Sequence, residues 1–321
     1  MSDSEPISKQ KRTRSSKSED HDSSPELDSD QEEGTVNVNF DVFHPVEEDA
    51  HDISGLLMHF VDDHPFHSMD IADLIISQAR NGEGIGSVVS TNEGEDVVGV
   101  SSIIDLQFSA ANQGVTDILH YVRTIVTNAE KSTEPSLTQA NNIDLFKQCL
   151  DGHHPTSLVL FERMINIIPQ LSPHIYRSLI SELHNSIEES DPKKNPRFVP
   201  PPQFRSTHYL ILSRIIIEES DIASNKSQPS KRKHKKKEKV KEKEIDINQA
   251  IFPHPEDEIF MKNQSASFLF PIVADRFGEE DTGLSQRGIA ILLTRENFER
   301  SSQELFDFYG IPDAELPKKP D

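Results

Sequence analysis

The chain has 321 residues, of which only 34% are hydrophobic, a smaller fraction than ordinary globular domains have, so part of the chain cannot be core. Lys and Arg number 33 against 55 Asp and Glu, a formal charge of -22 at pH 7. Such a charge repels phosphate backbones and anionic membranes, so we expect neither a membrane nor a specific nucleic acid as partner. The single cysteine, Cys149, excludes a disulfide framework or a multi-thiolate zinc finger and favours a reducing, intracellular compartment.

Residues 1–35 are rich in Ser, Asp, Glu and Lys and carry few apolar side chains. Such a segment cannot bury enough surface to offset its ordering entropy, so the sequence predicts a disordered tail. Within it, Ser16, Ser23 and Ser29 each stand three residues before a Glu. This spacing suits an acidophilic kinase, and we predict phosphorylation at these three serines.

Order is expected from residue 36, where apolar residues first recur with the period of a strand and then with that of a helix. The patterns predict, in chain order, a strand at 36–43, helices at 53–61 and 68–79, strands at 84–89 and 97–106, helices at 115–126 and 145–150, a strand at 157–161, a helix at 172–187, a strand at 208–217, strands at 266–273 and 288–293, and a last helix from Thr294 closed by Gly310. Helices and strands alternating in this way predict an α/β (α+β) fold with a central mixed sheet flanked by helices. We expect one domain at 36–312, interrupted by a disordered basic insert at 221–247 and followed by a tail at 313–321.

Patterns that would carry catalysis are weak. The glycine-rich string Asn81–Gly86 stands between a predicted helix and a predicted strand, whereas a phosphate loop needs a strand before it and a helix after it. Cys149 falls on the apolar face of its helix and is expected to be an inert buried thiol, and the pair His153 and His154 lacks an activated nucleophile. We expect no catalytic residue and no cofactor.

Histidines cluster in the first half of the ordered region, which raises the question of a metal site. They are His44, His51, His59, His64 and His67, beside Asp62 and Asp63. Zinc needs three or four converging ligands, and no HExxH pattern or cysteine pair fixes the others. We expect these histidines to face solvent on an acidic surface, with no bound metal.

Charge is divided sharply along the chain. From Ser18 to Val122 there is one basic residue, Arg80, against 23 Asp or Glu, whereas Lys226–Lys243 carries ten Lys or Arg and two Glu. An acidic body of this kind suits a basic partner. The insert matches the composition of a nuclear import signal, formed by Lys231, Arg232, Lys233, Lys235, Lys236 and Lys237, and equally that of a tether for RNA phosphates. Without interleaved aromatic residues it would bind RNA only nonspecifically, and we favour nuclear import.

Several ordered blocks resemble the BCCIP family, whose fungal members are called BCP. The blocks are Val36–Phe43, Asp52–Leu57, Ile85–Val89, Gly99–Leu106, Glu162–Gln170, the Lys-rich insert and Glu256–Lys262. The resemblance implies a fold similar to the GNAT acetyltransferases, without established catalysis, in a protein that shuttles between nucleus and cytoplasm. It also implies partners among the nuclear import and export machinery and, for fungal members, a newly made ribosomal protein of the large subunit.

The resemblance and the charge lead to one hypothesis and two alternatives. The hypothesis is a nuclear chaperone or adaptor whose acidic side chains bind a basic client, a large-subunit ribosomal protein; the predicted client-binding surface consists of Glu47, Glu48, Asp49, Asp52, Asp62 and Asp63. The first alternative is an export adaptor for a lipid kinase or other signalling cargo. The second is an acyltransferase that uses acetyl-CoA, although the expected Gln/Arg-x-x-Gly-x-Gly/Ala loop is missing between strand and helix.

Overall fold

The computed structural model covers most of the region that the sequence predicts to be ordered. The described residues are 40–62, 64–79, 84–91, 96–131, 140–189, 205–218, 250–272 and 284–312. The predicted tails, the basic insert with its import signal, the three serines and Asp63 lie outside these ranges.

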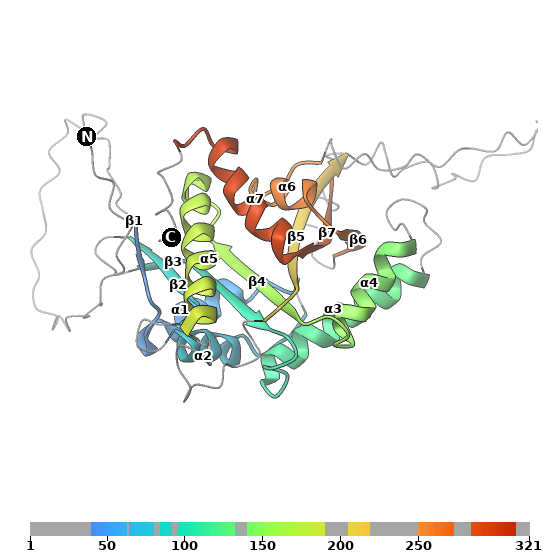
Figure 1. The fold of residues 1–321 in the computed structure, drawn as a ribbon, viewed down its shortest axis with the longest axis horizontal. Coiled ribbons are helices and arrows are strands. Elements are labelled where there is room, and N and C mark those ends of the chain that lie inside the picture. The colour runs from blue at the N-terminus through green and yellow to red at the C-terminus, as the bar shows by residue number, and fades with distance from the viewer. Residues whose placement is uncertain are drawn as a thin grey trace, which may run out of the picture.

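Seven strands in the described ranges form one mixed sheet in the order β1-β2-β3-β4-β5-β7-β6 (Figure 1). They are β1 (Phe40–Phe43), β2 (Ser87–Thr91), β3 (Asp96–Asp105), β4 (Thr156–Arg163), β5 (His208–Glu218), β6 (Ala266–Pro271) and β7 (Leu284–Thr294). Neighbours run antiparallel except β4 and β5, which are parallel. The predicted fold class, a mixed sheet flanked by helices, is confirmed, while its similarity to GNAT enzymes stays a prediction.

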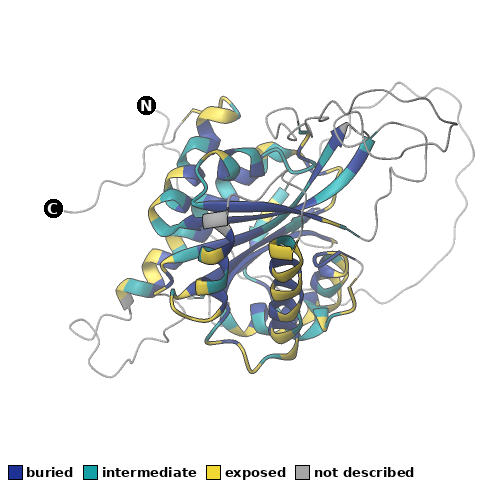
Figure 2. Ribbon diagram, turned by 90° about the vertical axis from the view of Figure 1, so that its right-hand side faces the viewer, coloured by how far each residue is buried: buried dark blue, intermediate teal, exposed yellow. Residues whose placement is uncertain are grey.

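Helices cover both faces of the sheet. They are α1 (Ala50–Leu57), α2 (Ser68–Gln78), α3 (Gln113–Lys131), α4 (Ala140–Leu150), α5 (Ser172–Glu189), α6 (Asp257–Lys262) and α7 (Arg295–Phe308), with short 3-10 turns η1 (Glu47–Asp49) and η4 (Pro169–Leu171). Helices α1 to α4 share one hydrophobic core with the sheet, and α5 to α7 share a second. Figure 2 shows the mostly buried strands, with exposed residues on the outer sides of the helices. No helix in the described ranges has the length and apolarity to cross a membrane.

Strand β4 shows how one sheet separates two cores. Leu158 and Leu160 belong to the core with α1 to α4, whereas Val159 and Phe161 belong to the core with α5 to α7. Successive side chains of a strand point to opposite faces, so a strand covered on both sides is apolar throughout. The continuous apolar run at 157–161 predicted this strand correctly.

Some predicted element ends are wrong. The helix expected at 53–61 ends at Leu57, and turns follow it up to Asp62, whose φ is 60°. Phe60 and Val61 are nevertheless buried, and this burial explains why they extended the helical pattern. At the other end of the chain, the Thr294 hydroxyl accepts a hydrogen bond from the Asn297 amide at 3.3 Å and so caps α7 as expected.

Candidate functional site

The parallel strands β4 and β5 pair over a short distance and then separate. Their register joins only Thr156 to His208, Ser157 to Tyr209 and Leu158 to Leu210, although both strands continue well beyond these pairs. A cavity of about 450 Å³ lies where they part, lined by residues of both strands. We call the space between Val159–Arg163 of β4 and Ile211–Ile216 of β5 the β4–β5 opening.

Backbone groups of both strands face this opening. The Met164 amide donates to the Val98 carbonyl, so even-numbered residues of β4 bond to β3 and odd-numbered ones, such as Phe161, face β5. The Arg295 amide donates to the Thr207 carbonyl, so odd-numbered residues of β5 bond to β7. The backbone N–H groups of Leu212 and Arg214 therefore point into the opening.

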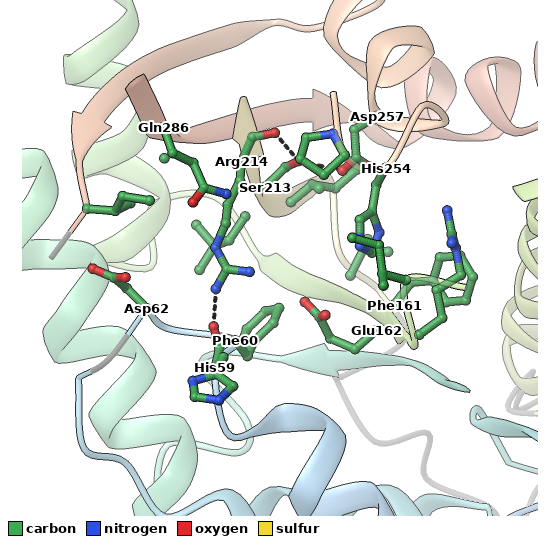
Figure 3. Close-up of a pocket in the computed structure, with 18 of the residues that line it drawn as sticks. His59, Phe60, Asp62, Phe161, Glu162, Ser213, Arg214, His254, Asp257 and Gln286 are labelled. Carbon is green, nitrogen blue, oxygen red and sulfur yellow. Dashed lines mark hydrogen bonds between the residues drawn. The ribbon is translucent and has the colours of Figure 1, made fainter. Parts of the chain in front are cut away.

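Charged and polar side chains enter the cavity from both faces of the sheet (Figure 3). On the side of α5 to α7 these are Arg163, Ser213, His254 and Asp257; on the side of α1 to α4 these are His59, Asp62, Glu162 and Arg214. The Arg214 guanidinium donates to the carbonyl oxygen of His59. Burial holds the pKa of His254 below its usual value, so this imidazole is neutral at pH 7.

Arg163 is fully engaged within the protein. Its guanidinium nitrogens lie 3.4 and 3.3 Å from the two carboxylate oxygens of Glu256, and a third hydrogen bond of 2.9 Å goes to the Ile167 carbonyl. The side chains of Arg163 and Glu256 are 4% and 0% exposed. The Tyr309 hydroxyl also donates to Glu256, at 3.3 Å. This ion pair joins the end of β4 to the start of α6, and it leaves neither charge available to a ligand.

Asp257 is buried beside this pair. Burial raises its pKa well above the usual range, with the carboxylates of Glu256 and Glu162 adding to the effect. The Ser213 hydroxyl lies 2.5 Å from Asp257 Oδ2. Asp257 thus contributes a hydrogen-bonded carboxyl group to the cavity wall.

Glu162 differs from the other charged groups around the cavity. Its carboxylate accepts no hydrogen bond from any described residue, and in Figure 3 it points into the space shared with Arg214. Burial raises its pKa to about 7, an effect that Arg214 and Arg163 oppose and Glu256 reinforces. At neutral pH this carboxyl is close to half ionised. A cation placed beside it would find an acceptor that the fold leaves unused.

The structure divides the predicted client-binding surface. Glu47, Glu48 and Asp52 are exposed around the start of α1. Asp49 is instead buried, because its carboxylate accepts a hydrogen bond from the Val46 amide at 3.0 Å and closes the first turn. Asp62 is also buried, at the wall of the cavity. Asp49 and Asp62 are therefore corrected from surface to interior positions, and client binding by the exposed three stays a prediction.

The other candidate sites do not assemble. In the part of the chain that the structure describes, no three His, Cys, Asp or Glu side chains come together as metal ligands. His67 instead lies 2.7 Å from Asp117. Cys149 is buried, and burial raises its thiol pKa, as an inert thiol requires. The segment after β4, Met164–Leu171, contains no glycine, so it lacks the residues that let a backbone loop approach a phosphate.

Sequence reasoning did not identify the cavity residues as a site. The sequence does contain one indication of them: Glu162 and Arg163 directly follow the apolar run of β4, and Arg214 lies between the apolar residues of β5. Charged residues are rarely buried without a partner. Their convergence depends on the parting of two strands that are distant in the sequence. That geometry is not encoded in the local periodicity of either strand.

The comparisons with known proteins agree with one another. The BCCIP family model matches residues 35–260. The Protein BCCIP homolog of Arabidopsis thaliana is 28% identical over 78% of this chain and 67% of its own length, and Protein bcp1 of Schizosaccharomyces pombe is 26% identical over 86% and 91%. The mouse protein named BRCA2 and CDKN1A-interacting protein is 24% identical over 78% and 71%.

A solved structure is also similar. The crystal structure of BCP1 from Saccharomyces cerevisiae aligns with a TM-score of 0.49 at 18% identity, covering 87% of this chain and 94% of that one. The family model spans well over half of the present sequence. The chain belongs to the BCCIP family.

Proposed function

We propose that this protein is a non-enzymatic nuclear chaperone or adaptor for a basic client, a newly made ribosomal protein of the large subunit, and that it supports ribosome biogenesis and protein export from the nucleus. The names of its relatives suggest a partner-binding protein, since the mouse relative is named for two protein partners. The observation that carries the choice of client is the segregation of charge: 23 acidic residues and one basic residue between Ser18 and Val122.

The physical argument concerns an unassembled ribosomal protein. Such a protein is basic because it must neutralise RNA phosphates, and before assembly that surface binds other polyanions. An acidic folded partner screens it and can then be displaced by RNA, whose charge density is greater. The exposed carboxylates of Glu47, Glu48 and Asp52 lie within the acidic stretch and form the surface that we test first.

A pull-down from nuclear extract tests the proposal. The full chain is used as bait at low and moderate salt, with nuclease added to remove bridging RNA. We expect one basic ribosomal protein of the large subunit, close to stoichiometric and lost as salt rises. Recovery of neutral or acidic signalling proteins, such as a lipid kinase, would instead support an export adaptor.

Matched charge variants test whether the client binds at the start of α1. The triple variant Glu47→Gln, Glu48→Gln, Asp52→Asn should weaken client binding and flatten its salt dependence. The control replaces three exposed carboxylates on α4 and α7, as Asp144→Asn, Glu296→Gln and Asp307→Asn, and removes the same charge. Equal losses in the two triple variants would refute the assignment to the start of α1.

Localisation has a separate test. Replacing Lys231, Arg232, Lys233, Lys235, Lys236 and Lys237 by Ala in a fluorescently tagged chain should abolish nuclear accumulation. Client binding in vitro should be retained. Continued nuclear accumulation would show that the insert is not the import signal.

The enzyme alternative has a direct test. An acetyl-CoA titration should leave the unfolding temperature unchanged, because a ligand that binds only the native state must raise it. The lack of a Gln/Arg-x-x-Gly-x-Gly/Ala loop between strand and helix in the sequence supports this expectation. A saturable increase would favour the acyltransferase alternative.

A further inference from the structure

The edge of β5 that faces the β4–β5 opening already pairs with another segment of the chain near the C-terminal end of the strand. Ile216 and Ile251 exchange two backbone hydrogen bonds of 2.9 Å in antiparallel geometry. The backbone N–H and C=O groups of Leu212 and Arg214 face the same way, and on that side no described strand pairs with them. Unpaired N–H and C=O groups along a strand edge are a template for an extended peptide.

The same edge is accessible although β5 is an interior strand. Leu212, Ser213 and Arg214 all retain partial exposure, because the sheet is open beside them. Apolar side chains are exposed at the cavity and beside it: Ile165, which lines the cavity, is 87% exposed, and Ile251, which pairs with the lining residue Ile216, is 60% exposed. Exposed apolar groups around a polar cavity are typical of a surface that binds another chain.

The charges of the opening select a cationic side chain. Arg163 is paired with Glu256, and Asp257 accepts the Ser213 hydroxyl. Arg214 lies on the same face as Glu162, but its guanidinium donates to the His59 carbonyl. Glu162 therefore remains without a hydrogen bond from the described residues. An incoming ammonium or guanidinium group would supply the missing donor in a partly desolvated position, where a charge-assisted hydrogen bond is strong.

We propose that the β4–β5 opening binds an extended segment of a basic partner, which adds to the Leu212–Arg214 edge of β5 and places a Lys or Arg side chain against Glu162. The proposal rests on the proposed function for the basic character of the partner. It adds a second contact, separate from the carboxylates at the start of α1, and the conformation in which the partner binds there. The backbone bonds supply affinity for any extended chain, and Glu162 supplies the preference for a cation.

Binding by this route depends on pH. A cation favours the ionised form of Glu162, so binding releases a proton wherever Glu162 is protonated in the free protein. Affinity should therefore rise from about pH 6 to about pH 8 while the lysines of the partner stay charged. The other charged or titratable groups around the cavity are His59, Asp62, Tyr121, Arg163, Tyr176, Arg214, His254, Glu256 and Asp257.

The first test measures affinity by fluorescence anisotropy with the full chain. The probe is a blocked synthetic peptide that alternates Lys and Val, and its comparison is the same peptide with every lysine acetylated. Glu162→Gln should weaken binding of the lysine peptide about tenfold or more and remove its pH dependence. The control Glu296→Gln, an exposed carboxylate on α7, should leave both unchanged. Equal affinity of the wild-type protein and Glu162→Gln would overturn the proposal.

The second test measures hydrogen exchange of backbone amides. Peptide binding should protect the amides of Leu212 and Arg214, whereas those of Ser213 and Ile215, which already face β7, should change little. No added protection at Leu212 and Arg214 would overturn strand addition. It would also be overturned if these two amides were protected in the free protein and released by deletion of residues 221–247, because the basic insert would then be the occupant.

The experiments distinguish failure of the proposed function from failure of the β4–β5 site. If the wild-type protein binds no basic ribosomal protein and no lysine peptide, the proposed function fails. If the wild-type protein and Glu162→Gln recover the same client equally from nuclear extract, the client function stands and the β4–β5 site is excluded.

Discussion

At the scale of single residues, the ion pair of Arg163 and Glu256 has large consequences because it is fully buried. Taking two charges out of water costs several kcal/mol, and their mutual attraction and hydrogen bonds compensate that cost only while both partners are present. Here the guanidinium makes three hydrogen bonds and the carboxylate receives a further one from Tyr309. The pair therefore holds the end of β4 against the start of α6, beside the opening.

Arg163→Met should lower the free energy of unfolding by about 3 to 5 kcal/mol, because it leaves the Glu256 charge buried without a cation. Adding Glu256→Gln should recover part of the loss. The control Lys262→Met breaks an exposed pair with Glu258, with side chains 58% and 45% exposed, and should cost less than about 1 kcal/mol. Urea unfolding measures all three. A loss below about 1 kcal/mol for Arg163→Met would contradict the importance of the buried pair.

Glu162 should make stability depend on pH. Its pKa is about 7 in the folded protein and near the ordinary value of 4.5 when unfolded. Between these values the folded state holds a proton that the unfolded state has lost, so stability falls as pH rises from about 4.5 to about 7. Above about pH 7 Glu162 is ionised in both states, and the loss of folding free energy reaches its full value, on the order of 3 kcal/mol.

Glu162→Gln removes that cost because glutamine does not ionise. The variant should match the wild-type protein near pH 4.5 and exceed its free energy of unfolding by about 2 to 3 kcal/mol at pH 8. Denaturant unfolding across this pH range gives the difference directly. A difference that does not change with pH would show that Glu162 titrates normally.

At the scale of elements, two helical glycines should respond oppositely to alanine. A Cβ added to Gly55 in α1 would meet no atom within 4 Å, whereas one added to Gly114 in α3 would lie 2.5 Å from the His67 carbonyl oxygen and 2.7 Å from Ile71 Cγ1. Gly55→Ala should stabilise the protein by about 0.5 to 1 kcal/mol, because alanine loses less backbone entropy on folding. Gly114→Ala should destabilise it by about 1 to 3 kcal/mol, because α2 and α3 would have to separate. Thermal unfolding of the two variants distinguishes the effects, and stabilisation by both would contradict the close packing of α2 against α3.

The elements also show how far the sequence predicts this protein. The apolar run at 157–161, the β-prone segment at 208–217 and the capped helix from Thr294 appear as β4, β5 and α7, because each has a strong local pattern. The parting of β4 and β5 was not predicted, since it depends on contacts between distant segments. The interior position of Asp49 was also missed, because its side chain caps its own turn rather than facing solvent as its charge suggests.

At the scale of the whole molecule, the two described segments that flank the basic insert are paired with each other. The chain leaves the described part of the sheet at the end of β5 and returns at Ala250, and the pairing of Ile216 with Ile251 joins the two ends. The described flanks of the insert therefore lie at the end of the sheet that holds the β4–β5 opening, because Ile216 also lines the cavity. One chain thus carries both the acidic stretch Ser18–Val122 and the basic stretch Lys226–Lys243 without a second domain.

Deletion of residues 221–247 should leave the fold intact because the ends of the insert are already joined. The segment carries ten Lys or Arg and five Asp or Glu, so its removal changes the net charge from -22 to -27. Closing a loop costs about 0.6 kcal/mol more for each doubling of its length, so a Gly-Ser linker about a quarter as long should raise the free energy of unfolding by about 1 kcal/mol. Urea unfolding with an unchanged slope, together with loss of nuclear accumulation, would separate import from folding. A loss of several kcal/mol would instead show that the insert contributes to the folded body.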